Sequence, residues 1–518
     1  MKPDIHVLED PEKIAAYLRD ESSAFTGNAE RVFLPRSAAE VAWILGQAND
    51  AGARVTISGA GTSITGSRVP LSGGWVVSME QVRHPASERP PVGFEQVHRR
   101  DFSFFLDSAG KRAIVPAGVR LSELDEALER FGLLYPPDPT EMSAMIGGTV
   151  ATNASGARSF RFGPTRAWVN GLRLVLPDGT PCHLARGQAF ATQAEGCLAV
   201  EGRVWRFPIP ASYRMPRTKN AAGLYLAPGM DLVDLFIGAE GLLGVITEVE
   251  IALIPRFGHL AATAAFFPTL GASLDFADRL RAGIDGKMPL SIEFFDARSL
   301  TFMRTAFPAI PGEAQGAILF EFAYEPAGRH NPFPSAATAM AWRKALEASH
   351  ALSDWTAIGR DLAEMKKFRH ALPEAINAWV RLRMGKLGMD LAVPGDRFRE
   401  IVRAYEDSAA TGVAFVLFGH IGDHHLHMNF LPENREQQET ARRRYLELAR
   451  QAAAAGGTIS AEHGVGKKTI TDESGNRVPY LALMTGEEGL RTIAGVKHAF
   501  DPDGRLNPGN MIPEGYQA

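Results

Sequence analysis

Histidines are crowded in one short stretch of this chain. Four of its 14 histidines fall within eight positions, at His420, His424, His425 and His427. Imidazole is a common metal ligand and the side chain that titrates near neutral pH. About thirty residues later a carboxylate and another imidazole stand side by side, as Glu462 and His463. A single histidine is more often structural, but the two segments together predict a metal-assisted acid/base site.

Glycine-rich segments recur in the first half of the chain. They span residues 58–66, 146–156 and 237–247. Glycine lets backbone amides converge on a phosphate and lets a flat ligand lie against the backbone. The first segment is not a GxGxxG turn, and it is not a Walker loop because Ser67 and Arg68 stand where that loop needs Lys and then Ser or Thr. Three such segments predict an extended cofactor that carries phosphate.

Composition narrows the class of protein. The chain has 518 residues, of which 45% are hydrophobic and 22% charged, so we expect a globular protein of two or three domains. The net charge is -4 and no long Lys/Arg run occurs, which excludes nucleic acid as an expected partner. Two cysteines make no disulfide framework, and no apolar stretch reaches about 18 residues. These features predict a cytoplasmic protein and leave open a peripheral association with the inner membrane.

The elements that must position these residues form a mixed pattern. Helices and strands do not alternate steadily, which favours an α+β fold. In the first half, helices are expected at residues 11–19, 38–51 and 121–131. In the second half, strands are expected at residues 291–295 and 317–324, and helices at 336–349, 362–380, 397–409 and 437–455. A hairpin of residues 413–418 and 426–431 would place the histidines at a strand end, with alternate residues on one face: His425, His427 and Asn429.

Taken in this order, the segments resemble those of the vanillyl-alcohol oxidase type of FAD-binding flavoproteins. The resembling branch contains D-lactate dehydrogenase, the glycolate oxidase flavin subunit and D-2-hydroxyglutarate dehydrogenase, and the resemblance runs from about residue 31 to residue 512. It implies an α+β, two-subdomain FAD-binding fold with an α+β substrate (cap) domain. The implied division is an FAD-binding domain at 1–255, a substrate-binding cap at 256–495, and a C-terminal segment at 496–518 that returns to the FAD domain.

The resemblance also implies the residues that bind FAD. Those for the pyrophosphate are Ser58, Gly59, Ala60, Gly61, Thr62, Ser63 and Gly66. Those for adenine, ribose and flavin are Pro137, Gly147, Gly148, Thr152, Asn153, Ser155, Gly156 and Gly163. The site would be completed by Glu240, Gly241, Gly244, Ile246, Asn507 and Asn510. Members that bind FAD covalently often have a histidine in the region of Thr62, so noncovalent FAD is expected here.

At the reaction site the resemblance implies a zinc or manganese ion held by His420, His427 and Glu462. His463 would act as base while hydride passes to the flavin, with Asn429 serving the substrate and Arg369 binding its carboxylate. The implied enzyme is an FAD-dependent dehydrogenase that oxidises a D-2-hydroxy acid, lactate-like or larger, to the 2-oxo acid.

The chain departs from these relatives at several positions, among them Pro373, which stands where the hydroxyglutarate enzymes have a Thr. His424 and His425 stand where relatives often have Gly and Asn, so the ion could have a different ligand set. Gly388 occupies the place of a substrate-binding Lys in the hydroxyglutarate enzymes, so a strict hydroxyglutarate dehydrogenase is not expected.

The sequence leaves three alternative functions open. One is a nonredox flavoenzyme resembling alkyldihydroxyacetonephosphate synthase, another is a flavin-free metallohydrolase, and a third is a flavin-fold subunit without turnover. Because no nicotinamide motif is found, a quinone or an electron-transfer protein is the expected electron acceptor. A homodimer is left open.

Overall fold

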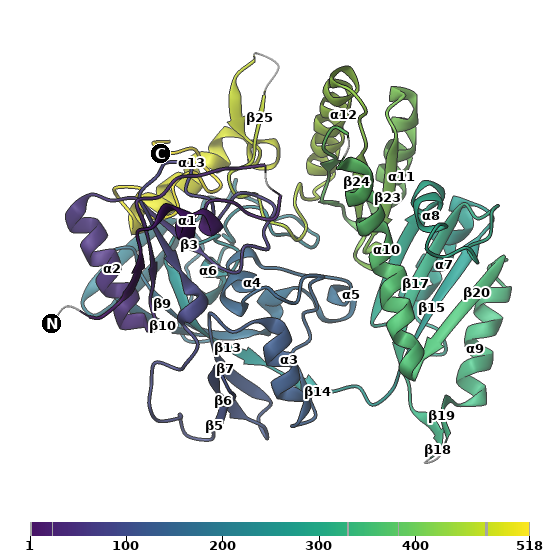
Figure 1. The fold of residues 1–518 in the computed structure, drawn as a ribbon, viewed down its shortest axis with the longest axis horizontal. Coiled ribbons are helices and arrows are strands. Elements are labelled where there is room, and N and C mark those ends of the chain that lie inside the picture. The colour runs from purple at the N-terminus through teal and green to yellow at the C-terminus, as the bar shows by residue number, and fades with distance from the viewer. Residues whose placement is uncertain (1–2, 23, 329–330, 382, 472–474, 517–518) are drawn as a thin grey trace.

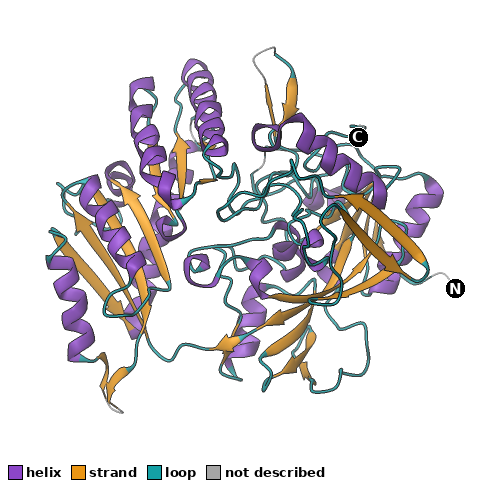
Figure 2. Cartoon of the chain, turned by 180° about the vertical axis from the view of Figure 1, so that it is seen from behind, coloured by secondary structure: helices purple, strands orange, loops and turns teal. Residues whose placement is uncertain are grey.

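The computed structural model describes residues 3–22, 24–328, 331–381, 383–471 and 475–516. Figure 1 shows the N-terminal half, in purple to blue, gathered on one side with the yellow C-terminal segment, and the green segment on the other side. Figure 2 shows the same arrangement from behind, with strands and helices mixed on both sides. This mixture confirms the predicted α+β class. Among the described helices, none combines the length and apolarity that a bilayer crossing needs.

Two sheets form the centre of the N-terminal half. The four-stranded sheet has the order β1 (His6–Leu8), β2 (Arg31–Leu34), β4 (Trp75–Ser78) and β3 (Val55–Ser58). The six-stranded antiparallel sheet has the order β10 (Pro181–Ala185), β9 (Val169–Val175), β13 (Val245–Ala252), β7 (Arg112–Pro116), β6 (Ser103–Asp107) and β5 (Glu95–His98). Two small ladders join β11 (Glu195–Val200) to β12 (Arg203–Pro208) and β8 (Leu133–Leu134) to β14 (Ile254–Pro255).

The helices around these sheets are α1 (Pro11–Ile14), α2 (Ala38–Ala51), α3 (Leu121–Glu129), α4 (Ile146–Thr152), α5 (Ser159–Phe162) and α6 (Val233–Phe236). The prediction of α2 is confirmed, because the Ser37 hydroxyl accepts from the amide of Glu40 and Gly52 ends the helix with φ 64°.

Helix α4 was not predicted, since glycine has a low helix propensity. Its glycines serve packing instead: a Cβ added at Gly147 would lie 2.6 Å from the Cβ of Ala117. The helix can therefore approach the neighbouring backbone closely, and this contact is invisible to local propensity.

One antiparallel sheet organises the second half. Its order is β20 (Ser353–Ile358), β15 (Leu260–Phe267), β17 (Gly316–Ala323), β16 (Ser291–Asp296), β23 (Phe415–Gly419), β24 (His425–Phe430) and β21 (Leu387–Gly388), and β22 (Leu391–Ala392) also pairs with β24. Side chains alternate across it, so Phe266 and Phe295 pack with α8 (Ala297–Met303) and α10 (Leu362–Val380), whereas Phe267 and Phe320 pack with α7 (Leu270–Ala282). Helices thus cover both faces.

The remaining elements of the second half are α9 (Ala336–Glu347), α11 (Phe398–Asp407) and α12 (Arg435–Ala454), with the hairpins β18 (Pro326–Gly328) with β19 (Asn331–Pro334) and β25 (Thr469–Thr471) with β26 (Arg477–Pro479). The predicted hairpin around the histidines is confirmed: β23 and β24 pair antiparallel, and the short helical turn Ile421–Asp423 joins them.

The C-terminal part of the chain lies against the first half. Helix α13 (Ala482–Phe500), which the sequence did not predict, packs on β12, and the ring of Phe500 lies 6.2 Å from that of Trp205 and 5.8 Å from that of Phe236. Beyond it, the amide of Asn507 donates to the carbonyl of Val55 at 2.7 Å. The domain limits at residues 255 and 495 stay a prediction.

Candidate active site

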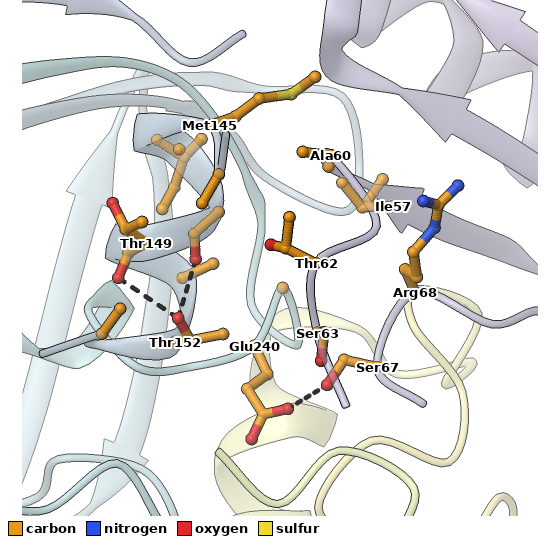
Figure 3. A pocket seen from close by; sticks show the side chains of 18 of the residues that line it. Ile57, Ala60, Thr62, Ser63, Ser67, Arg68, Met145, Thr149, Thr152 and Glu240 are labelled. Atoms are coloured by element: carbon orange, nitrogen blue, oxygen red, sulfur yellow. Dashed lines mark hydrogen bonds between the residues drawn. The ribbon is translucent and has the colours of Figure 1, made fainter. Parts of the chain in front are cut away.

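A cavity of about 310 Å³ opens between the glycine-rich segments. Figure 3 shows the loop that carries Ala60, Thr62 and Ser63 facing helix α4 across it, with Glu240 and Ser67 at its base. The cavity is lined by these predicted FAD residues: Gly59, Ala60, Gly61, Thr62, Ser63, Gly147, Gly148, Thr152, Ser155, Glu240, Gly241, Gly244, Ile246 and Asn507. Three segments distant in sequence therefore converge on one space.

Other predicted FAD residues lie outside the lining. They are Ser58, Gly66, Pro137, Asn153, Gly156, Gly163 and Asn510. Several of these support the wall. A Cβ at Gly156 would lie 1.9 Å from the carbonyl oxygen of Asp138, and the Asn153 amide donates to the carbonyl of Asn220 at 2.9 Å. Asn510 donates to the carbonyl of Glu240 at 2.9 Å.

Glu240 links the cofactor loop to the C-terminal half. Its buried carboxylate accepts from the Val465 amide at 2.8 Å, from the Gly466 amide at 2.9 Å and from the Ser67 hydroxyl. Asn507 and Asn510 hold its carbonyl. The segment that follows His463 is thereby fastened to the glycine loop.

The cavity suits a large ligand with phosphate. A Cβ added at Gly59 or Gly148, both on the lining, would meet no atom within 4 Å, so bare backbone faces open space. Within the described residues, the amides of residues 60–63 donate to no backbone or side-chain acceptor, and the buried hydroxyl of Ser155 has no partner. Unpaired amides in a glycine turn are anion-binding groups, so the residues present fit the pyrophosphate of FAD.

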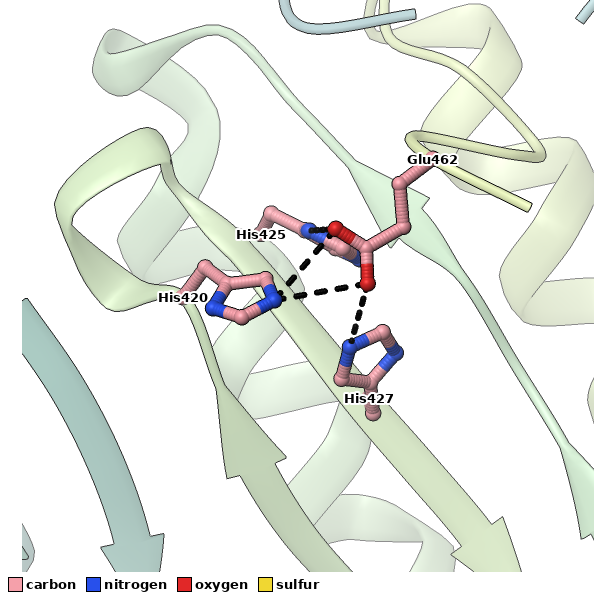
Figure 4. A group of neighbouring side chains, drawn as sticks. All are labelled: His420, His425, His427 and Glu462. Carbon is pink, nitrogen blue, oxygen red and sulfur yellow. Dashed lines mark hydrogen bonds and ion pairs between the residues drawn. The ribbon is translucent and has the colours of Figure 1, made fainter. Parts of the chain in front are cut away.

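The hairpin of β23 and β24 positions the histidines. His420 directly follows β23 at the start of the turn. His425 and His427 are two residues apart on β24, so their rings lie on one face, with centroids 4.4 Å apart. Figure 4 shows the three imidazoles around the carboxylate of Glu462. Nε2 of His420 and Nε2 of His427 each lie 3.3 Å from an oxygen of Glu462.

This cluster fits a divalent metal ion. The donor atoms of His420, His425, His427 and Glu462 lie within 4.8 Å of one another, and those of Asp390, His427, Glu462 and His463 form a second such group. Three imidazoles and a buried carboxylate are the donor types that zinc and related ions take. The predicted ligands His420, His427 and Glu462 are thus brought together.

Two further carboxylates, those of Glu293 and Asp390, orient the imidazoles. Nδ1 of His420 lies 2.6 Å from Glu293, and Nδ1 of His463 lies 3.1 Å from Asp390. Burial would lower the pKa of His420, but Glu293 and Glu462 raise it to about 9. Burial would likewise lower the pKa of His463, and Asp390 raises it. Burial would raise the pKa of Glu462, but the ammonium of Lys219 and His420 hold it well below its ordinary value.

Three residues of this site were missed by sequence reasoning. Lys219 is almost fully buried, with its Nζ 2.9 Å from Glu462. Asp390 accepts from the Ser460 hydroxyl at 2.8 Å and from the amide of His463 at 2.9 Å. Glu293 lies on β16. Each comes from a different segment with no pattern of its own, so no local signal could have found it.

Arg369 and Asn429 lie next to the cluster rather than in the cavity wall. Nε of Arg369, on α10, lies 3.6 Å from the Glu293 carboxylate. Asn429 is buried on β24 opposite Gly388, where an added Cβ would lie 2.8 Å from the Asn429 side-chain oxygen. A larger residue at 388 would therefore meet this amide.

The two halves of the site meet. Glu462 and His463 line the same cavity as the glycine backbone of the first half. A glycine-walled cavity in an α+β fold, with a carboxylate and an imidazole on its lining, suits an enzyme that binds an extended cofactor beside its substrate.

Comparison with known proteins identifies the family. Residues 29–185 match the model of the FAD binding domain, and residues 259–511 match that of the FAD linked oxidases, C-terminal domain. The chain belongs to the FAD-linked oxidases and is an FAD-dependent oxidoreductase of the D-lactate dehydrogenase and glycolate oxidase type. The predicted family, fold type and FAD cofactor are confirmed.

Curated relatives match nearly the whole chain at modest identity. The glycolate oxidase subunit GlcD of Bacillus subtilis is 27% identical, covering 96% of this chain and 92% of its own. The D-lactate dehydrogenase of Archaeoglobus fulgidus is 26% identical, covering 93% and 91%. A solved structure of alkyldihydroxyacetonephosphate synthase aligns with TM-score 0.63 at 14% identity over 98% of this chain and 82% of its own. This last likeness shows the fold alone.

Proposed function

We propose that this protein oxidises a D-2-hydroxy acid, lactate-like or larger, to the 2-oxo acid. The observation that carries the proposal is that Glu462 and His463 line the cavity formed by the FAD-binding segments. An alcohol bound to the cluster would therefore lie beside the cofactor. The names of the relatives, glycolate oxidase and D-lactate dehydrogenase, support a small hydroxy acid.

His463 is the proposed base. Asp390 engages its Nδ1, which leaves Nε2 to take the proton of the substrate hydroxyl. The chemistry that FAD supplies when bound is acceptance of the hydrogen and electron pair that leave Cα. The O–H and C–H bonds break, a C=O bond forms, and the substrate loses two electrons.

We propose that His420, His427 and Glu462 hold a zinc or manganese ion. When bound, the ion would lower the pKa of the substrate hydroxyl. Arg369 supplies a planar cation for the substrate carboxylate, and Asn429 offers an amide on the face shared with His427. A quinone or an electron-transfer protein is the proposed acceptor.

The alternatives lose support to different degrees. The FAD-binding family disfavours a flavin-free metallohydrolase. A nonredox enzyme of the alkyldihydroxyacetonephosphate synthase kind rests on a likeness of fold alone.

The test is anaerobic mixing of the purified flavoprotein with D-lactate, L-lactate, glycolate and larger D-2-hydroxy acids. Bleaching of the flavin band near ~450 nm by a D-acid is expected. A yellow protein that no hydroxy acid bleaches would contradict the dehydrogenase. Bleaching that persists after complete chelation would contradict the metal.

A further inference from the structure

His425 is the least explained residue of the cluster. It is completely buried on β24, and its ring centroid lies 5.3 Å from that of His420 and 4.4 Å from that of His427. Among the described residues, its Nδ1 has no hydrogen-bond partner, whereas its Nε2 lies against the carboxylate of Asp390. A buried ring nitrogen without a partner is costly, so Nδ1 is the atom of this imidazole that is free to bind a ligand.

The orientation of the ring follows from two carboxylates. Nε2 of His425 lies 2.7 Å from Oδ1 of Asp390, so this carboxylate holds that edge of the ring. On the other edge of the ring, Nδ1 points toward Glu462 at 4.0 Å from Oε2. Figure 4 shows this nitrogen beside the carboxylate of Glu462.

The spacing is compatible with one shared ion. Two ligand atoms that each bind an ion at about 2.1 Å can lie at most about 4.2 Å apart. The 4.0 Å between Nδ1 of His425 and Oε2 of Glu462 falls inside this limit. The carboxylate of Asp390 beside Nε2 is the partner that commonly orients a metal-bound imidazole.

We propose that His425 is a fourth protein ligand, through Nδ1, of the metal ion held by His420, His427 and Glu462. The inference rests on the metal site of the proposed function and extends it to a set of three imidazoles and one carboxylate.

A fourth protein ligand would restrict which ions can bind both the protein and the substrate. Four protein ligands fill the tetrahedral shell of zinc and leave no position for a substrate. An ion that takes six ligands, such as manganese, keeps two positions, which match the hydroxyl and carboxylate oxygens of a 2-hydroxy acid. With the fourth ligand, of the two ions named above, manganese would suit the site better than tetrahedral zinc.

The experiment counts nitrogen ligands on the Mn²⁺-loaded flavoprotein by pulsed electron paramagnetic resonance. Three coupled imidazole nitrogens are expected in the wild type. His425→Asn should leave two and weaken Mn²⁺ binding by ~10-fold or more, measured by titration of the metal-free protein.

The matched control is His424→Asn. This neighbouring imidazole packs against Phe398, with centroids 5.2 Å apart, and belongs to neither group of metal-ligating atoms. It has φ 57°, a conformation that Asn tolerates well. The control should keep three coupled nitrogens and the wild-type affinity.

Two coupled nitrogens in the wild type would overturn the proposal, and this result needs no variant to fold. A His425→Asn protein that keeps three coupled nitrogens and the wild-type affinity for Mn²⁺ would also overturn it. Three coupled nitrogens in a protein whose flavin reduction ignores chelation would support the ligand set and refute only the catalytic use of the metal.

Discussion

Replacement of Glu240 tests how the substrate segment is tied to the cofactor loop. Its buried carboxylate takes two backbone amides, of Val465 and Gly466, and the Ser67 hydroxyl. A buried donor left without an acceptor costs about 1–3 kcal/mol. Glu240→Ala orphans both amides and should cost about 2–6 kcal/mol. Glu240→Gln keeps one acceptor oxygen and should cost about 1–3 kcal/mol.

The measurement is urea unfolding of the holoprotein, followed through flavin release and circular dichroism. The matched controls are Glu141→Ala and Glu141→Gln, because Glu141 also lines the cavity but is exposed. Both Glu240 variants should lose stability relative to these controls, with Ala worse than Gln. A Glu240→Ala protein within ~0.5 kcal/mol of its control would refute the reasoning.

Three further outcomes are expected. Asp390→Asn should slow anaerobic flavin reduction by ~10²-fold in stopped flow and leave the flavin content unchanged, because Nδ1 of His463 loses its carboxylate partner. The control Asp396→Asn, at an exposed position, should leave the rate of flavin reduction unchanged. Burial lowers the pKa of Lys467 from 10.5 to about 7, so between these pH values the unfolded chain binds one more proton than the folded protein, and stability should rise with pH. Lys467→Met should flatten this rise, measured as the difference in thermal midpoint between about pH 7 and about pH 10. An unchanged difference would contradict the prediction. Gly148→Leu should fill space beside the cavity and lower the ratio of flavin to protein absorbance, and full flavin content would show that the space is not used.

Local chemistry made part of the fold predictable. Ser37 and Gly52 mark the ends of α2 because a hydroxyl cap and a left-handed glycine act within a few residues. The position of His425 and His427 on one face of β24 was also predictable, because side chains alternate between the two faces of a strand with a period of two residues.

Packing overrode local preference elsewhere. Helix α4 forms through two glycines because Gly147 allows close contact with Ala117. Helix α13 was missed although it packs closely against β12, since its stabilising partners lie far away in sequence.

By itself, the sequence determined the family, the FAD cofactor and the residue types of the site, because motifs of small residues and imidazoles carry that chemistry in their order. Only the tertiary structure decided which groups stand next to one another. Lys219 beside Glu462, Asp390 beside His463 and Glu240 beneath the glycine loop are contacts between distant segments. Burial and neighbouring charges at those contacts shift the pKa values of the site and decide which polar atoms lack a partner. Both depend on contacts that form only when the chain folds.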